Sequence, residues 1–388
     1  MSRVLEGVRV LDFTTAIAGS YAIRLLADLG ADVIKVESFE GDSFRSQVGN
    51  FVVWNSGKRG IVVDLRRKEG REIIYRLVRN VDVIAQNFRP GTARKLGIDY
   101  ETLSAINPRL VYSSASSWGD TGPYGGKPGY DPVLQAESGI MASQGRGQAT
   151  PMDLTHAEVD IATTALHAYS ILAALYAREA TGQGQHVKTS LMAGALAVQA
   201  DTFVFCQGKP ASPSAGDGYL GPAATNRFYK TRDGWTFIEC EDDRSWEALC
   251  QALVELRLKD DERFSSPALR GQNDGALAAI LTQAFSTRSS AEALEQLQGA
   301  GVPSAPVNGY DRIPQEPQVV ACALLGDYYQ PVARGYLKQQ GTFFKLAETP
   351  SSISRPAPLL GEHTREVLSE LRYSPDEIDH LRELRVIP

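Results

Sequence analysis

Residues 8–37 read VRVLDFTTAIAGSYAIRLLADLGADVIKVE. Val8–Phe13 is a β-rich run, Ser20–Leu29 has a helical pattern that Gly30 ends, and Asp32–Glu37 is a second β-rich run. A strand, a helix and a second strand in this order predict a β-α-β unit with parallel strands. This stretch decides the fold class, because the residues that follow repeat the same alternation.

The alternation continues to residue 120. Further strands are predicted at Gly60–Leu65, Val81–Phe88 and Leu110–Ala115. Helices are predicted between them at Lys68–Arg79 and Tyr100–Ile106. Repeated alternation predicts a parallel sheet with helices on both faces, which is an α/β domain. Residues 116–152 are rich in Gly, Ser and Pro and are predicted to form a long surface loop.

The second half of the chain changes character. Asp160–Glu179 predicts a long helix with one apolar face, formed by Ile161, Ala165, Ala168, Leu172 and Leu175. Residues 207–222 have the composition of a linker. Residues 226–320 combine a short β pattern with amphipathic helices near Ser245–Leu258, Ala276–Ser286 and Ala291–Ala300, which predicts a smaller α+β domain. Helices around Thr364–Leu371 and Ser374–Leu384 are predicted to end the chain.

Composition excludes several classes of protein. The 388 residues are 43% hydrophobic and 22% charged, which excludes wholesale disorder. The formal charge of -6 and the lack of a long basic run argue against nucleic acid as a partner. The four cysteines have no CxxC spacing, and the five histidines form no HxH or HExxH cluster, so we expect reduced thiols and no metal site. With no signal-peptide pattern and no run of ~18 apolar residues, a cytoplasmic enzyme that spans no membrane is expected.

Several common catalytic motifs are absent. The first strand–loop–helix lacks GxGxxG, which disfavours a nicotinamide site, and the chain has neither a GxSxG elbow nor a P-loop. A loop of small residues between a strand and a helix is still a general place for phosphate or adenine binding. A plain βα turn explains the same residues equally well.

Asp160, directly before the apolar helix pattern, has two interpretations. As an N-cap it would satisfy free backbone N–H groups at the helix start, and on the pattern alone this interpretation is favoured. Alternatively, the same donors would keep a half-buried carboxylate ionised and able to act as a nucleophile. The glycine-rich stretches Trp118–Gly129 and 145–147 likewise fit either flexible turns or a mobile loop over a site.

Long blocks of the sequence resemble the class III CoA-transferases, also called the CaiB/BaiF or formyl-CoA transferase family. The blocks include EGVRVLDFTTAIAGSYAIRLLADLGADVIKVESFEGDSFR, NSGKRGIVVDL, QNFRPGTARKLGIDYETLSAINPRLVYSSASSWGDTGPY, KPGYDPVLQAESGIM, LAALYAREATGQGQHV and PLLGEHTREVLSEL. They occur in family order from residue 6 to near 371, and the match is weakest across 200–330.

The resemblance implies a fold and an assembly. A Rossmann-like large α/β domain is expected from both chain ends, with a smaller α+β domain between them. The implied ranges are 1–205 for the first, CoA-binding part of the large domain, 206–225 for a linker, 226–325 for the small domain and 326–388 for the return. The family also forms an interlocked homodimer of ring-shaped subunits, which composition could not have suggested.

The resemblance also assigns site residues. Asp160 occupies the position of the family's catalytic aspartate, which reverses the preference for an N-cap. The implied CoA-binding positions are Ala16, Ile17, Ala18, Arg66, Asn87, Phe88, Arg89 and Lys95. The three cations among them suit phosphates, and Phe88 offers an apolar surface for adenine. Asp131 matches an acidic position near the family's active site.

The expected activity is therefore transfer of CoA from an acyl-CoA donor to a carboxylic acid, with a small dicarboxylic acid as one possible acceptor. Asp160 would form a mixed anhydride and then an enzyme–CoA thioester, with acyl-CoA as substrate and with no metal or tightly bound cofactor. Ile17 stands where formyl-CoA transferases have glutamine, which disfavours an oxalate or formate enzyme. Arg45 and Arg227 are candidates for contacting a second carboxylate, although surface ion pairs explain them equally well.

Two alternatives remain open. An acyl-CoA racemase shares the fold and the aspartate, but Tyr130 stands where racemases have a catalytic histidine, so one base of a two-base proton transfer is missing. A non-catalytic CoA-binding protein would share the fold without the covalent chemistry.

Overall fold

A computed structural model describes residues 3–144, 150–208 and 218–388 of the chain. The chain forms two compact units. Unit 1 comprises Met1–Met141, Asp153–Gly208 and Gln318–Pro388, and unit 2 comprises Ala142–Met152 and Lys209–Pro317. The glycine-rich stretch 145–147 and residues 209–217 of the predicted linker lie outside the described residues. The larger unit therefore draws on both ends of the chain.

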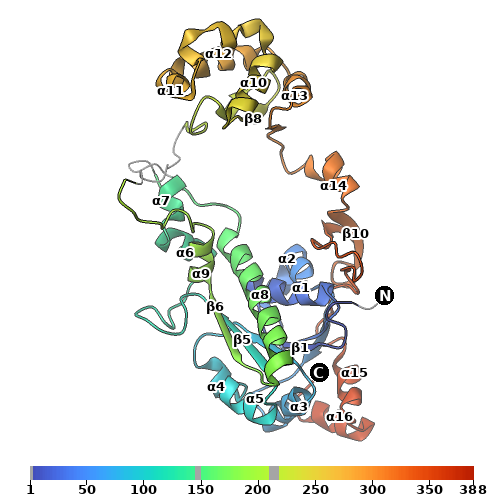
Figure 1. Ribbon diagram of the computed structural model, residues 1–388. Coiled ribbons are helices and arrows are strands. Elements are labelled where there is room, and N and C mark those ends of the chain that lie inside the picture. The colour runs from blue at the N-terminus through green and yellow to red at the C-terminus, as the bar shows by residue number, and fades with distance from the viewer. Residues whose placement is uncertain (1–2, 145–149, 209–217) are drawn as a thin grey trace. The chain divides into compact units, whose positions relative to one another are not determined.

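Unit 1 is built around a six-stranded parallel sheet (Figure 1) with the strand order β3-β2-β1-β4-β5-β6. The strands are β1 (Arg9–Asp12), β2 (Asp32–Glu37), β3 (Arg59–Val62), β4 (Val83–Gln86), β5 (Val111–Ser116) and β6 (His186–Ser190). This is the order of a doubly wound dinucleotide-binding fold, and it confirms the predicted α/β class with a parallel sheet. The order reverses between β1 and β4, which opens a crevice at the carboxyl ends of these strands.

Alternate residues of the strands face two different helical layers. Val10, Val33 and Val83 pack in one core with residues of α1 (Ala16–Asp28) and α8 (Glu158–Thr181). Their neighbours Leu11 and Ile34 face the other core, because successive side chains of a strand point to opposite faces. That second core contains residues of α3 (Lys68–Val78), α5 (Tyr100–Ile106), α15 (Thr364–Glu370) and α16 (Pro375–Glu383). The two ends of the chain therefore share one core, with α15 and α16 near α3 in Figure 1.

The remaining elements of unit 1 lie around this sheet. The helices are α2 (Val48–Asn55), α4 (Thr92–Leu96), α6 (Asp131–Glu137) and α9 (Leu191–Ala197), while α7 (Ile140–Gln144) and α14 (Pro317–Ala321) each include residues of both units. A hairpin consists of β10 (Leu325–Gln330) and β11 (Gly335–Gln340). The prediction of one long loop over residues 116–152 is wrong, because α6 and α7 form within it. Asp131 begins α6 and Pro132 follows it at a position that suits proline.

Helix α8 has two apolar faces rather than the single predicted one. Val159, His167 and Ile171 face the core, whereas Ile161 and Ala165 of the predicted face are exposed. The helix is long and apolar enough by composition to cross a bilayer. It packs against α1, α9, β5 and β6 within unit 1, as the core helix of a folded unit does.

Unit 2 has an antiparallel sheet in the order β7-β8-β9. The strands are β7 (Asn226–Lys230), β8 (Trp235–Glu239) and β9 (Ser304–Pro306). The helices packed with them include α10 (Asp243–Ala252), α11 (Pro267–Gln272), α12 (Asp274–Ser286) and α13 (Ser290–Gly299). The core of the unit contains Ile238, Leu249, Leu281 and Phe285, and capping boxes begin α10 and α13.

Candidate active site

A cavity of about 320 Å³ opens at the carboxyl ends of β1, β4 and β5 in unit 1. Its lining comes from four segments: the start of α1, the residues after β4, the residues after β5, and the start of α8 with that of α9. The residues are Thr15, Ala16, Ala18, Asn87, Phe88, Arg89, Pro90, Ala115, Ser116, Ser117, Trp118, Gly119, Gly126, Lys127, Pro128, Gly129, Tyr130, Asp160 and Leu191. The reversal of strand order predicts a ligand site at this crevice.

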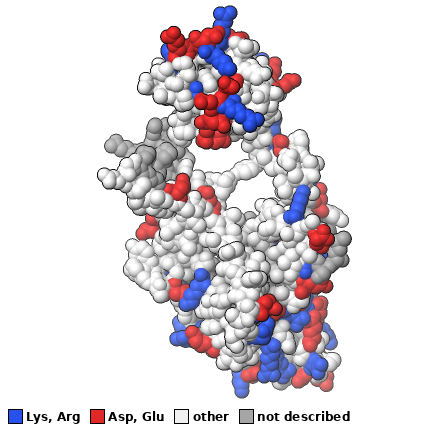
Figure 2. All heavy atoms as spheres, viewed as in Figure 1, with Lys and Arg blue, Asp and Glu red and all other residues white. Residues whose placement is uncertain are grey.

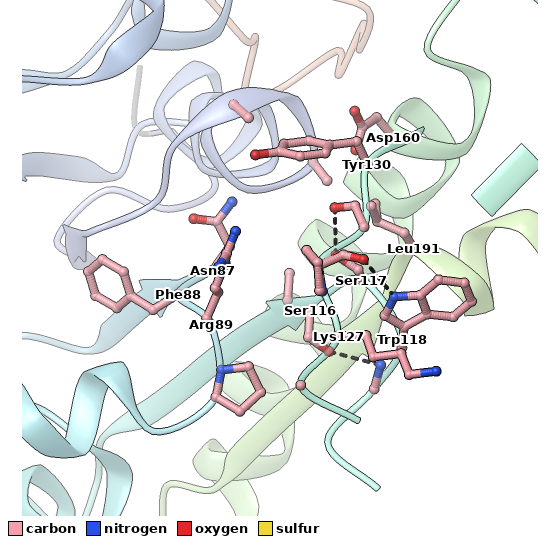
Figure 3. Close-up of a pocket in the computed structure, with 18 of the residues that line it drawn as sticks. Asn87, Phe88, Arg89, Ser116, Ser117, Trp118, Lys127, Tyr130, Asp160 and Leu191 are labelled. Carbon is pink, nitrogen blue, oxygen red and sulfur yellow. Dashed lines mark hydrogen bonds between the residues drawn. The ribbon is translucent and has the colours of Figure 1, made fainter. Parts of the chain in front are cut away.

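Asp160 contributes its side chain to the cavity from the first turn of α8 (Figure 3). The helix begins at Glu158, and its N-cap is Ala157, which makes no side-chain cap. The N-cap interpretation of Asp160 is therefore wrong. The ring of Tyr130 lies next to Asp160 in the cavity.

Asp131 supplies the cap that the start of α8 lacks. The backbone N–H of Asp160 donates to Asp131 Oδ2 at 2.8 Å, which satisfies one of the free donors of the first turn. Gln135 Nε2 donates to Asp131 Oδ1 at 2.5 Å and also reaches the carbonyls of Leu154 and His156 at 3.3 Å. Asp131 and Gln135 are both buried. Their hydrogen bonds therefore fix the segment before Asp160 against α6.

The environment of Asp160 raises its pKa to about 7. Burial is the larger cause, and the neighbouring Asp131 carboxylate adds to it. Donors at the helix start were expected to keep the carboxylate ionised, but Asp131 takes the backbone N–H of this residue. Near neutral pH the carboxyl group is therefore close to the midpoint between its protonated and its ionised form.

The cavity brings together several of the residues predicted to bind CoA. Ala16 and Ala18 line it from α1, and Asn87, Phe88 and Arg89 line it from the segment after β4. The carboxamide of Asn87 accepts from the backbone N–H of Thr15 at 2.9 Å and donates to the Thr15 carbonyl at 2.7 Å. Asn87 therefore holds the facing loop in addition to lining the cavity.

Other predicted residues lie outside this lining. Ile17 is partly buried in the first turn of α1, and Lys95 is exposed on α4. Arg66 is exposed and forms an ion pair with Asp64, with 2.8 Å between Nε and Oδ1.

The lining of this cavity includes neither of the two arginines considered for a second carboxylate. Arg45 is paired with Glu37, with 2.6 Å between Nη2 and Oε2. Arg227 belongs to β7 of unit 2, where its guanidinium lies over the ring of Tyr229. The ion-pair interpretation of Arg45 is the one that the structure supports.

Sequence reasoning missed part of the lining, namely Ser116, Ser117, Trp118, Lys127 and Leu191. Most of these belong to the stretch at and after the end of β5, whose glycines fitted either flexible turns or a mobile loop. The base of that stretch is closed by two hydrogen bonds, from Ser117 Oγ to the Gly129 carbonyl at 2.8 Å and from Trp118 Nε1 to the Pro128 carbonyl at 3.2 Å. The high glycine content was the available signal, but it did not indicate which side chains face the cavity.

A second cavity of about 260 Å³ adjoins the first and shares Phe88, Arg89, Pro90, Ala115 and Ser116 with it. Its wall includes Tyr100, Tyr112 and His186, whose rings pack within 6 Å of one another. No group of three or more potential metal ligands occurs within the described parts of the chain.

A doubly wound α/β unit with an aspartate at the crevice of its sheet places a carboxyl group where such folds bind ligands. The CoA-transferase family III profile matches residues 5–364, and the chain belongs to this family. It is therefore an acyl-CoA:carboxylate CoA-transferase, and enzymes of this family use CoA thioesters as substrates.

Named relatives cover nearly the whole chain. A succinyl-CoA:mesaconate CoA-transferase of Haloarcula hispanica is 35% identical over 94% of this chain and 96% of its own length. A succinate–glutarate CoA-transferase of Agrobacterium fabrum is 33% identical over 95% of each chain. The crystal structure of a CAIB/BAIF family protein from Brucella suis has a TM-score of 0.84 and 33% identity, over 96% of this chain and 100% of that one.

Proposed function

We propose that Asp160 is the nucleophile that carries CoA from an acyl-CoA donor to a carboxylic acid. The observation that supports this most directly is the position of the Asp160 side chain in the cavity, with its pKa raised to about 7. A carboxyl group with a pKa near the working pH is both sufficiently ionised and sufficiently reactive.

The reaction runs through three covalent intermediates. A carboxylate oxygen of Asp160 attacks the thioester carbon, the C–S bond breaks, and CoA leaves as a thiolate from a mixed anhydride. The thiolate then attacks the aspartyl carbon, which forms an enzyme–CoA thioester and releases the donor's acid as a carboxylate. The acceptor carboxylate attacks this thioester, which breaks its C–S bond and forms a second anhydride. The released thiolate attacks the acceptor's acyl carbon in this anhydride, which gives the new acyl-CoA and frees the Asp160 carboxylate. No oxidant, ATP or metal is consumed.

The lining suits the parts of CoA. Phe88 and the aromatic wall of the adjoining cavity offer flat surfaces for the base, and Arg89 carries a positive charge where the two cavities meet. Ala16, Ile17 and Ala18 begin α1, whose N-terminal end favours negative charge. Arg66 and Lys95 are exposed cations on unit 1 and are proposed to contact the phosphates.

A small dicarboxylic acid is the proposed acceptor. The relatives named above carry succinyl-CoA, succinate, glutarate or mesaconate in their names. Arg89 and Lys127 are the cations of the cavity lining. A dicarboxylate keeps one free carboxylate after its other one has become a thioester, so a cation in the cavity gives it an advantage over a monocarboxylate.

The chain is proposed to act as an interlocked homodimer in the cytoplasm. The outer face of α8 exposes Ile161, Tyr169 and Tyr176, with 47%, 71% and 84% of each residue accessible. Charged side chains are sparse over the middle of unit 1 on the face seen in Figure 2. An apolar stripe of this length favours burial against a second copy. Unpaired Cys206, Cys240, Cys250 and Cys322 fit a reducing compartment.

The proposal is tested by Asp160→Ala, with Glu158→Ala in the same helical turn as a matched control. The protein is incubated with succinyl-CoA and analysed by mass spectrometry for an enzyme–CoA adduct, and turnover is measured with glutarate. Asp160→Ala is expected to lose the adduct and about 10⁴-fold or more in turnover, whereas Glu158→Ala keeps both. Substantial turnover by Asp160→Ala would refute the nucleophile, and deuterium uptake at the α-carbon without an acceptor would indicate a racemase instead.

A further inference from the structure

The loop between β1 and α1 is strained at the point where it lines the cavity. Thr15, Ala16 and Ala18 all contribute to the lining. Ala16 has a φ of 57°, in the left-handed region that disfavours any residue with a Cβ atom. Strained backbone of this kind persists only where surrounding groups hold it in place, and it concentrates at functional sites. Three side chains from three separate elements hold this loop.

Lys35 holds the beginning of the loop. Its Nζ donates to the Thr14 carbonyl at 2.7 Å and pairs with Asp42 at 2.9 Å. Asp12, at the end of β1, accepts from the backbone N–H of the same Thr14 at 2.9 Å and is paired with Lys58 at 2.7 Å. These charged side chains are at most 1% exposed, so each charge is balanced inside the protein.

Asn87 holds the next residue. Its carboxamide pairs with both backbone groups of Thr15, at 2.9 Å for the N–H and 2.7 Å for the carbonyl. Two parallel hydrogen bonds fix the orientation of the Thr15 peptide groups, which a single bond would leave free to rotate.

His167 holds the far end of the loop from α8. It is fully buried, with Nδ1 at 3.4 Å from the Ala18 carbonyl and Nε2 at 2.6 Å from Ser113 Oγ on β5. A carbonyl oxygen only accepts, so Nδ1 carries the proton and Nε2 accepts from the Ser113 hydroxyl. The ring therefore ties α1 to α8, the helix that also carries Asp160, two turns away.

We propose that Lys35, Asn87 and His167 are positioning residues that together hold the strained loop Thr14–Ala18 against the Asp160 cavity. We call these three side chains the loop clamp. Their role rests on the proposed function of Asp160. Removing a member of the loop clamp allows Ala16 to relax, which moves the wall on which the substrate must lie. A displacement of about 1 Å at a reacting centre lowers rates by up to about 100-fold.

A buried ion pair elsewhere in α1 provides the comparison. Arg24 and Asp28 are almost fully buried and pair at 3.3 Å, and Arg24 donates to backbone carbonyls of Val53, Gln340 and Gly341. None of these atoms belongs to the loop. If buried polar contacts in α1 mattered for stability alone, disrupting this pair would affect catalysis as much as disrupting the loop clamp.

The test compares His167→Leu, His167→Asn and Asp28→Asn. The readouts are kcat/KM for succinyl-CoA, the single-turnover rate of adduct formation, and the unfolding midpoint. His167→Leu is expected to lower kcat/KM and the adduct rate by about tenfold. His167→Asn places a donor near the position of Nδ1 and is expected to recover most of the loss. Asp28→Asn, which changes a buried pair that does not touch the loop, is expected to leave kcat/KM and the adduct rate unchanged. Wild-type kinetics in His167→Leu, no recovery in His167→Asn, or an equal loss in Asp28→Asn would each overturn the proposal.

A second measurement needs no activity. Ala16→Gly removes the strain. Because relaxation of Ala16 offsets part of the loss in the Ala background, His167→Leu is expected to shift the unfolding midpoint more in the Gly background than in the Ala background. Equal shifts in the two backgrounds would contradict a clamp that opposes strain. If His167→Leu does not fold, Ser113→Ala releases the ring by removing only a hydroxyl, and the same non-additivity is expected. If the wild-type protein forms no adduct, the proposed function fails. The comparison of unfolding midpoints with and without Ala16→Gly still tests the loop clamp in that case.

Discussion

Unit 1 buries charged side chains beneath its cavity, whereas unit 2 keeps its charges at the surface. Lys35, Lys58, Asp12 and Asp42 of unit 1 are at most 4% exposed. Among the described residues of unit 2, the buried polar side chains are Thr231 and Thr236, and ion pairs such as Lys259–Glu247 are more than half exposed. The fold of unit 2 is stabilised by apolar burial and helix capping. Apolar contacts are not directional, so they tolerate small displacements of the atoms better than buried ion pairs do.

The contrast between the buried ion pairs of unit 1 and the exposed charges of unit 2 shows what buried charge contributes to a fold. Burying an ion pair contributes little net stability, because desolvation offsets the attraction. Its directional contacts instead specify one arrangement of the groups around it, and here those groups carry the strained loop beside Asp160. The core of unit 2, by contrast, is apolar in the part of the chain that the structure describes.

Lys58→Met is expected to destabilise the protein by about 3–5 kcal/mol, because it leaves the buried Asp12 carboxylate without its partner. Burial lowers the pKa of Lys58 to about 8, although Asp12 opposes this change. The free energy of unfolding is measured by urea titration at pH 7. Replacing both partners, with Lys58→Met and Asp12→Leu, should recover part of the loss. A cost below about 1 kcal/mol would show that the pair is not energetically coupled.

Asp160→Asn is expected to stabilise the fold at pH 8 by about 1–2 kcal/mol. The folded pKa of Asp160, about 7, lies above the ordinary value of 3.8. Below about pH 4 both states are protonated and the residue costs nothing. Between about pH 4 and 7 the unfolded chain ionises first, so the wild-type fold loses stability as pH rises. The difference between variant and wild-type unfolding free energies should therefore grow from pH 4 to pH 8, and a difference independent of pH would contradict the assignment.

Asp131→Asn is expected to move the acid limb of the kcat/KM profile toward lower pH. Removing the neighbouring negative charge lowers the pKa of Asp160, while an asparagine oxygen can still accept from its backbone N–H. In the wild type, activity at pH 6 is expected to be about one-tenth of that at pH 8, because one-tenth of the Asp160 is ionised. In the variant this ratio should rise. Glu137→Gln, on the exposed side of the same helix, is the control and should leave the acid limb of the kcat/KM profile at the wild-type pH.

Lys259→Ala is expected to change the free energy of unfolding by less than about 0.5 kcal/mol, because its pair with Glu247 is exposed and 3.8 Å long. The measurement is the same urea titration used for Lys58→Met. A loss comparable with that of Lys58→Met would remove the contrast between the two units.

The sequence predicted the parts of the fold that depend on local pattern. Strands β1, β2 and β4 lie within predicted runs, and β5 extends one residue beyond its predicted run, because the residues of each strand are largely buried. Strand β6 was missed, since HVKTS is a partly exposed edge strand with a polar composition. Helix α2 and the β10–β11 hairpin were also missed.

The features of the candidate site also divide into those that the sequence predicted and those that only the structure shows. Resemblance to a family pointed to Asp160 and to the loop before α1, whereas the residue pattern alone favoured a helix cap. Neither could show that Asp131, 29 positions earlier, accepts from the backbone of Asp160. The lining by Trp118, Lys127 and Leu191 also depends on how separate loops meet at the ends of the strands.

By itself the sequence determined the alternation of strands and helices and the membership of a family, and it predicted Asp160 as the catalytic carboxylate. Each of these depends on contiguous residues. Only the tertiary structure decided the pKa of that carboxylate and the conformation of the loop beside it. Both depend on burial and on contacts between residues far apart in the chain, such as Asp131 with Asp160 and His167 with Ala18. Electrostatic and hydrogen-bond energies follow distance in space, and the fold sets those distances.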